Sequence, residues 1–215
     1  MASRKTTDDR RARIEAMRRA EQSRERRSRI ITIAVSGLVV AGLVGFGVYV
    51  LNKESEQQEQ RVALAKKPIK AEKSWDAKKL GRNHVKEAVS YPQTPPVGGD
   101  HNQAWLNCDR NVYKEAVPNE NAVHSLEHGA VWVTYNDKAS KDDVKKLEEK
   151  VKETSYSFIS PVQDQADPLM LTAWGKQVSV DGADDKRVLQ FFEKYVQGDQ
   201  TPEPGAACTG GVTAK

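Results

Sequence analysis

The N-terminal end of this chain is strongly basic but contains no aromatic residue. Residues 1–29 hold eleven Arg or Lys and five Asp or Glu, a net charge of +6, while the whole chain carries +4. The remaining residues, 30–215, therefore carry a net charge of −2. Proteins that bind single-stranded nucleic acids stack the bases on aromatic side chains, which this tail lacks. The basic pI thus describes a tail, and the sequence predicts no nucleic-acid partner.

Charge itself is absent from residues 30–51, a run of 22 residues. As a helix this run would be about 33 Å long, enough to cross the roughly 30 Å hydrocarbon core of a bilayer. A buried helix of a soluble protein would be shorter, and a cleaved signal peptide would have a shorter apolar region with a small-x-small site close behind it. The segment has no cysteine nearby, which excludes a lipoprotein anchor. We therefore expect a single transmembrane helix.

The charges that flank this segment predict its orientation. Positive residues favour the cytoplasmic side of a membrane, and four arginines precede the segment: Arg24, Arg26, Arg27 and Arg29. The ten residues that follow it hold two basic side chains and three glutamates. We expect a single-pass protein of the cell membrane with a cytoplasmic tail (1–29), a transmembrane helix (30–51), a stalk or linker (52–80) and an extracytoplasmic domain (81–215).

Small residues recur along the predicted transmembrane helix at Gly37, Ala41 and Gly45. Residues four apart lie on one helix face, and small side chains let a second transmembrane helix approach closely. We expect this face to pack against another membrane protein, although glycine is common in such helices for other reasons.

The pattern after the stalk predicts a compact α+β domain. Strands are expected at 130–136, 155–162 and 168–175, where β-branched and aromatic residues are frequent. Amphipathic helices are expected at 140–153 and 183–197, where apolar residues recur at helical spacing. The order strand, helix, strand, strand, helix fits a ferredoxin-like sandwich whose last strand is missing or comes from residues 84–91.

The two cysteines, Cys108 and Cys208, both follow the predicted span. An oxidising compartment outside the membrane favours a disulfide between them, because no other thiol competes. Two free thiols and joint metal ligation are the alternatives. A disulfide would fasten the C-terminal segment to the loop beside His101.

Half of the four histidines lie in the sequence VHSLEHG, residues 123–129. On a helix, His124 and His128 share one face and could bind one metal ion, with Glu127 nearby. A third ligand could be His101, which follows a glycine pair, whereas His84 has no partner pattern and is interpreted as a surface residue. Imidazole ligands suit copper and zinc alike. We predict a metal site of His101, His124, His128 and Glu127.

Two other interpretations of these histidines remain open. The string H-x-x-E-H matches an inverted zinc-peptidase motif, so a zinc hydrolase with Glu127 as base is one alternative. The motif requires a long helix and a downstream ligand, whereas Gly129 ends the helix here. The other alternative is structural, with the histidines hydrogen-bonding the backbone to hold in place the Pro-Gly loop, YPQTPPVGGDH at 91–101. No nucleophile elbow surrounds Ser125, and we expect binding rather than catalysis.

At these residues the chain resembles the actinobacterial proteins grouped as domain of unknown function 3105. The resemblance lies in PPVGGDH (95–101), AW (104–105), VY (112–113), VHSLEHGAVWVTY (123–135), LTAWG (171–175) and PEPGAAC (202–208). It implies a cytoplasmic tail, one span and an outer domain, but no activity. In this chain Gly98, Gly99 and Asp100 depart from the family's usual loop sequence. His101 is retained. By analogy, the resemblance suggests an accessory subunit of a larger envelope complex, with the cytochrome bcc–aa3 respiratory supercomplex as candidate partner.

Overall fold

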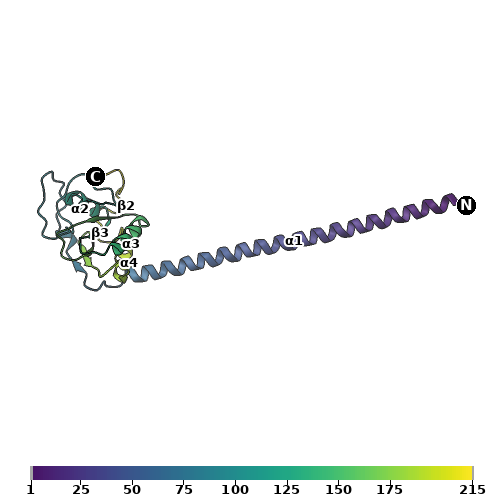
Figure 1. The fold of residues 1–215 in the computed structure, drawn as a ribbon, viewed down its shortest axis with the longest axis horizontal. Helices are drawn as coiled ribbons and strands as arrows, with labels where there is room; N and C mark the ends of the chain where they lie inside the picture. The colour runs from purple at the N-terminus through teal and green to yellow at the C-terminus, as the bar shows by residue number, and fades with distance from the viewer. Residues whose placement is uncertain (1, 215) are drawn as a thin grey trace. The chain divides into compact units, whose positions relative to one another are not determined.

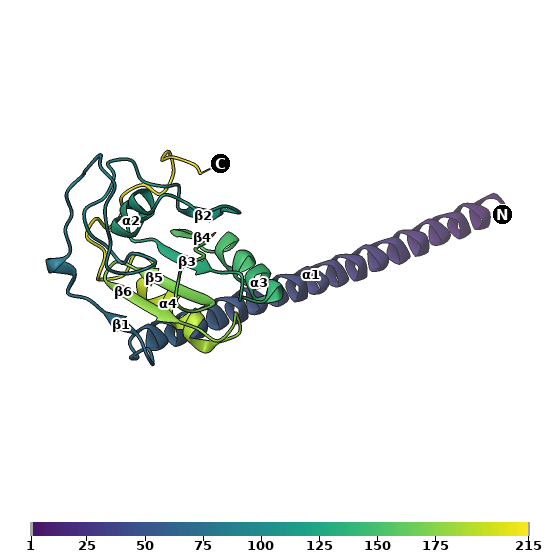
Figure 2. The ribbon, with the colours of Figure 1, turned by 60° about the vertical axis from the view of Figure 1, so that its left-hand side comes forward.

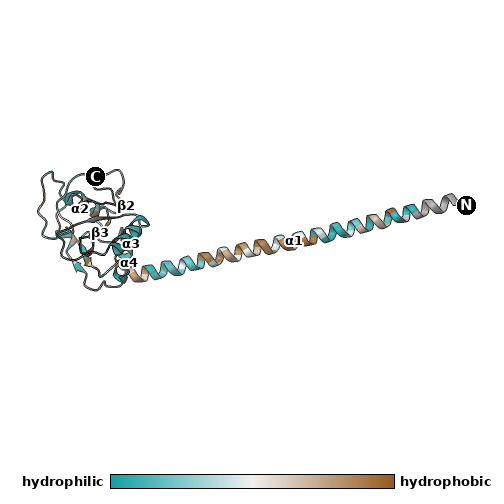
Figure 3. Cartoon of the chain, in the orientation of Figure 1, coloured by the Kyte–Doolittle hydropathy of each residue, from teal (hydrophilic) through white to brown (hydrophobic). Residues whose placement is uncertain are grey.

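The computed structural model describes residues 2–214, with side chains from Arg10 onward except Ala12. Helix α1, Ala2–Ala65, contains the apolar segment, and Figure 3 shows a hydrophobic stretch of this helix with hydrophilic residues on either side. The stretch Arg13–Ala65 is long and apolar enough to cross a membrane, as a membrane anchor or a signal sequence would be. Gly37, Ala41 and Gly45 are all exposed on it. Their contact with a partner helix stays a prediction.

Residues 59–215 form a compact unit built on one mixed six-stranded sheet (Figures 1 and 2). Its strands are β1 Lys73–Ser74, β2 Asp109–Val112, β3 Val131–Tyr135, β4 Ser157–Pro161, β5 Leu169–Ala173 and β6 Lys176–Ser179. Their order in the sheet is β1-β6-β5-β3-β4-β2. Strand β4 runs parallel to β2 and β3, while β3–β5, β5–β6 and β6–β1 are antiparallel. The sheet confirms the α+β class.

Two amphipathic helices cover one face of this sheet, as the sequence predicted. Helix α3, Lys141–Lys152, begins after Ser140, whose hydroxyl accepts a hydrogen bond from the backbone N–H of Asp143. Helix α4, Lys186–Tyr195, begins after Asp185, which caps it in the same way. Because an N-cap satisfies an N–H group that has no partner within the helix, these residues define where the helices start. Their apolar faces pack against the side chains of Val131 and Val133.

The strand pairing does not confirm the ferredoxin-like arrangement. In that arrangement the two parallel strands of the first βαβ unit are split by another strand, but β3 and β4 pair directly here. Residues 84–91 form an isolated bridge from His84 to His101 rather than a sheet strand. The sheet instead contains three strands that the sequence did not predict, β2, β6 and β1, and β1 lies in the segment predicted to be a stalk.

Residues 59–80 contact the rest of the compact unit in other ways as well. The side chain of Ile69 is buried in the same core cluster as Val188 and Phe191 of α4. The amide of Gln190 donates a 2.9 Å hydrogen bond to the carbonyl of Lys67. In this structure the end of α1 and the segment after it therefore belong to the folded unit.

The other face of the sheet is covered by helix α2, Asn119–Glu127, and by irregular segments. Successive residues of a strand point to opposite faces, so Trp132 lies on this face while its neighbours Val131 and Val133 lie on the other. Trp132 stacks on Phe158 at 5.5 Å between ring centroids. These two rings, together with Leu126 of α2, form a second buried cluster.

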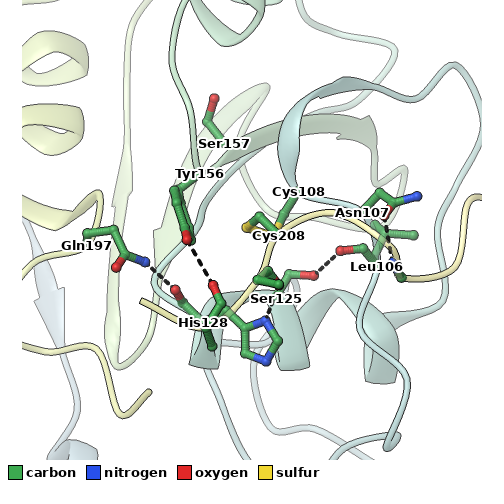
Figure 4. The surroundings of a disulfide bond; sticks show 12 residues. Leu106, Asn107, Cys108, Ser125, His128, Tyr156, Ser157, Gln197 and Cys208 are labelled. Carbon is green, nitrogen blue, oxygen red and sulfur yellow. Dashed lines mark hydrogen bonds between the residues drawn. A yellow bond between two sulfur atoms is a disulfide. The ribbon is translucent and has the colours of Figure 1, made fainter. Parts of the chain in front are cut away.

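A disulfide joins Cys108 to Cys208, the pairing that the sequence predicted, and Figure 4 shows it beside α2. The two residues are 100 positions apart and both are buried. Closing a loop of that length removes conformational freedom from the unfolded chain. This stabilises the folded state by about 4.7 kcal/mol at most. The bond fastens the C-terminal segment to the strand-like segment that leads into β2.

Candidate metal centre

Helix α2 places His124 and His128 on one face, one turn apart. Its last residue is Glu127, and the backbone N–H of His128 still donates to the carbonyl of His124 at 3.1 Å. Gly129 then leaves the helix with φ of +89°, a conformation that favours glycine, and a side chain there would collide with Thr201. The glycine thus ends the helix one residue after His128, where the sequence predicted the end.

Three imidazoles in this region are oriented by backbone carbonyls. The Nδ1 atom of His101 lies 2.8 Å from the carbonyl oxygen of Gly99, that of His124 lies 2.8 Å from Asn102 O, and that of His128 lies 2.7 Å from Ala207 O. A carbonyl oxygen only accepts, so each Nδ1 carries the proton. Each ring of a neutral histidine would therefore present the lone pair of Nε2. All three side chains are buried.

These rings lie close together, and His84 joins them. The centroid of the His124 ring is 4.8 Å from that of His101, 4.5 Å from that of His128 and 4.9 Å from that of His84. The exposed His84 stacks on His124 with an angle of 24° between the ring planes. The sequence interpretation of His84 as a surface residue is right, but the ring does have partners.

Glu127 is a buried carboxylate held between two basic groups. Its Oε2 lies 2.8 Å from Nε2 of His101, and its Oε1 accepts from Nε of Arg82 at 2.5 Å. Burial would raise the pKa of Glu127, but these two contacts outweigh burial and lower the pKa to about 2. Glu127 is therefore an ionised carboxylate at neutral pH, with both oxygens engaged.

The same contact alters His101. Among the described residues its Nε2 has no regular hydrogen-bond partner, yet it faces the Glu127 carboxylate at ion-pair distance. Burial lowers the pKa of His101, but the carboxylate and the Gly99 carbonyl together raise it above the usual value. The raised pKa favours the charged form of His101, which pairs with the Glu127 carboxylate at 2.8 Å.

His124 behaves in the opposite way. Burial, followed by the neighbouring histidines, lowers its pKa to about 4, although the Asn102 carbonyl acts against this. His124 is therefore neutral at physiological pH. A neutral imidazole with a free Nε2 lone pair is the form that binds a metal ion.

Two sets of side chains could each surround an ion, because one potential ligand atom from every member lies within 4.8 Å of those of the others. We call them the four-ligand group, His84, His101, His124 and Glu127, and the three-ligand group, His124, His128 and Glu203. The predicted residues His101, His124, His128 and Glu127 are thus brought together, but they are divided between two groups that share His124. His84 and Glu203 complete the groups.

Sequence reasoning missed three residues here: His84, Arg82 and Glu203. Arg82 contacts Glu127 and, at 3.5 Å, Glu203. None of the three lies near VHSLEHG in the sequence. Pairing of the His84 backbone with that of His101 brings the first two to the cluster, and the disulfide helps to bring Glu203. A local pattern does not contain this information.

The cluster also connects α2 to the irregular segments around it. Ser125 is fully buried and donates a 2.6 Å hydrogen bond to the carbonyl of Leu106. Gln197 donates to the carbonyl of His128, and Tyr156 donates at 2.9 Å to the carbonyl of Ala206 (Figure 4). The side chain of Ser125 is therefore occupied by the backbone, as expected for a structural rather than a nucleophilic serine.

The fold and this cluster define an α+β domain with a buried histidine-carboxylate centre, preceded by an apolar helix. The chain belongs to the family described as a protein of unknown function (DUF3105), whose sequence profile matches residues 84–210, more than half of the chain. The match includes every residue of both ligand groups. No curated protein and no solved structure matches the chain.

Proposed function

We propose that this protein is a membrane-anchored domain that binds one transition-metal ion at the histidine cluster. The supporting observation is the way His124 and His128 are oriented, each donating Nδ1–H to a backbone carbonyl. Histidines that ligate metals are oriented in this manner by partners on the other ring nitrogen. The ring centroids of His124 and His128 are 4.5 Å apart, and one ligand atom from each lies within 4.8 Å of the other and of one from Glu203.

Ligand spacing favours the three-ligand group as the position where an ion binds first. Two ligands about 2.1 Å from an ion in tetrahedral geometry lie about 3.4 Å apart. Nε2 of His128 and Oε2 of Glu203 are 3.8 Å apart, which leaves room for an ion. Nε2 of His101 and Oε2 of Glu127, at 2.8 Å, are too close to share one without moving apart. In this proposal, His101 and Glu127 are ligands only after that contact opens.

The ligand set indicates zinc or copper(II). Imidazole nitrogen and carboxylate oxygen suit both ions, whereas thiolate, the ligand that most favours copper(I), is not offered because both cysteines are in the disulfide. A three-ligand site also leaves a coordination position for water or another ligand.

The hydrolase alternative gains no support from Glu127. A general base works best when its pKa is near the working pH. Glu127 has a pKa of about 2, and its two oxygens face Arg82 and His101. Such a carboxylate is a weak base and has no free oxygen with which to position a water molecule.

A structural function is favoured by the same hydrogen bonds that orient the rings. His124 and His128 connect α2 to the carbonyl of Asn102, directly after the Pro-Gly loop, and to the carbonyl of Ala207 in the C-terminal segment. This second candidate function requires only the Nδ1–H donors and leaves Nε2 unused. The two functions can therefore be separated by a substitution that keeps one nitrogen and removes the other.

The replacement His124→Asn separates them in the full-length protein in mild detergent. An asparagine amide can take the place of Nδ1–H but offers no group at Nε2. We expect the wild-type protein to bind one Zn²⁺ or Cu²⁺ by calorimetry and the variant to lose at least about 100-fold in affinity, with a nearly unchanged melting temperature without metal. Glu193→Gln, at the Arg61 ion pair, is the control that should bind normally. If the wild-type protein binds neither ion, the metal-binding proposal is wrong and the structural function is the one that stands.

The proposal also includes topology and partners. An N-terminus in the cytoplasm and a domain outside are supported by the arginines before the span and by a disulfide, which persists in oxidising compartments. An outside-active reporter fused to the C-terminus should be active, and an inactive but inserted fusion would reverse this orientation. Membership of an envelope complex, with the respiratory supercomplex as candidate, is supported by the family resemblance alone and is tested by co-purification in mild detergent.

A further inference from the structure

The two ligand groups share one residue, His124, and this residue can serve one ion at a time. Its Nδ1 is committed to the carbonyl of Asn102, so Nε2 is the nitrogen that remains for a metal. His124 belongs both to the four-ligand group and to the three-ligand group. An ion bound by either group therefore removes the central ligand of the other.

Charge also disfavours two ions. The groups contain two carboxylates, Glu127 and Glu203, and both are already contacted by the guanidinium of Arg82. Two dications would add four positive charges beside Arg82, against two negative ones. At separations of a few ångströms this repulsion is large in a partly buried environment.

Each group combines buried ligands with one that is open to solvent. In the four-ligand group this residue is His84, which is exposed and lines a surface pocket with Asn102 and Trp105. In the three-ligand group it is Glu203, whose side chain is 43% exposed. His84 stacks on His124, so the lone pairs of the two rings do not converge, but an exposed ring can turn without displacing packed atoms.

We infer that the cluster holds a single ion that exchanges between the two groups, with His124 as its common ligand. This inference rests on the proposed metal-binding function. The ion enters at the three-ligand group, where the spacing between His128 and Glu203 already suits it. It passes to the four-ligand group when His101 and Glu127 move apart. The cluster thus binds and releases an ion, and it is not a site for a permanent cofactor.

The test uses Co²⁺ as a spectroscopic probe with the full-length protein in mild detergent. The wild-type protein should bind one Co²⁺ per chain. His128→Asn removes a ligand of the three-ligand group only, and His84→Asn removes one of the four-ligand group only. Both variants should still bind one Co²⁺, about 10- to 100-fold more weakly, and with visible spectra that differ from each other. His124→Asn should abolish binding. Melting temperatures without metal confirm that each variant is folded.

The outcomes separate this inference from the function on which it rests. Two Co²⁺ per wild-type chain would overturn the inference, because the groups would be independent. Loss of all binding in one of the two single-group variants, with no change in the other, would also overturn it and leave a single fixed site. Absence of Co²⁺, Zn²⁺ and Cu²⁺ binding in the wild-type protein would refute the metal-binding function itself.

Discussion

On one face of the sheet, α3 and α4 pack Leu147, Val188 and Phe191 against alternate residues of the strands. On the other face, α2 lies among segments without regular structure and is connected to them through Ser125, His124 and His128, whose side chains donate to backbone carbonyls. The first face is stabilised mainly by burial of apolar area. The second also needs hydrogen bonds and a disulfide, because an irregular segment leaves backbone groups that secondary structure does not satisfy.

This difference shows why the histidine cluster is on the α2 face. Polar side chains can be buried only where they find partners, and the carbonyls of the Pro-Gly loop and the C-terminal segment supply them. The face covered by α3 and α4 contains regular elements whose backbone groups are already paired. A cluster of imidazoles and a carboxylate would lack partners there.

The largest expected effect is removal of the disulfide. Replacing Cys108 and Cys208 together by serine should lower the free energy of unfolding by up to about 4.7 kcal/mol, because the unfolded chain regains the conformational freedom that the closed loop of 100 residues removed. Urea denaturation of the full-length protein measures it. Metal affinity should fall as well, since Ala207, the partner of His128, is adjacent to Cys208. If stability and affinity both stay at wild-type values, the α2 face does not depend on the covalent bond.

A cavity on the opposite face should affect stability alone. Leu147 is 1% exposed, and Leu147→Ala should cost about 3 kcal/mol through lost contacts and the cavity left behind. Metal affinity should be unchanged, because the residue packs on the α3 and α4 face. Leu189→Ala, at a position that is 42% exposed, is the matched control and should cost less than about 0.5 kcal/mol. A loss of metal affinity in Leu147→Ala would show that the faces are coupled.

Breaking the buried ion pair on the α2 face should have an intermediate effect. Glu127→Gln keeps the shape of the side chain but leaves Arg82 and His101 without their carboxylate. We expect a loss of about 2 kcal/mol at neutral pH, below the usual range for buried pairs because Arg82 is 46% exposed. Urea denaturation measures the loss, and Glu193→Gln, at the Arg61 ion pair far from the cluster in sequence, is the control. An equally stable variant would mean that the pair contributes no net stability.

The smallest effect concerns pH and the start of α4. The side-chain hydrogen bonds from Arg187 lower the pKa of Asp185 from 3.8 to about 2 despite partial burial. A lowered pKa contributes stability that is fully present above the unfolded value of 3.8 and is lost as pH falls through about 2. Asp185→Asn keeps the helix cap and removes the charge, so it should cost about 1 kcal/mol at pH 7. The difference from wild type in urea midpoints should shrink below pH 4. A difference independent of pH would contradict this cause.

Both predicted helices on the α3 and α4 face could be found from the sequence because their apolar periodicity and their caps are local. Strands β3, β4 and β5 were found for the same reason, from β-branched and aromatic residues. Strands β1, β2 and β6 were missed because they are two to four residues long and rich in polar residues, and they form by pairing with other strands of the sheet. The ferredoxin-like arrangement was inferred from element order, which does not specify whether β3 and β4 are neighbours.

The sequence by itself determined that residues 30–51 are apolar over a length that can cross a membrane, that His124 and His128 share a helix face, and that Cys108 had one possible partner. These properties depend on composition or on spacing along one element. Only the tertiary structure decided that His84, Arg82 and Glu203 join the cluster, and that His101 faces Glu127 rather than a free space. Those contacts are made by loop segments separated by tens of residues, whose positions follow from backbone pairing, a disulfide and buried carbonyls rather than from any local periodicity.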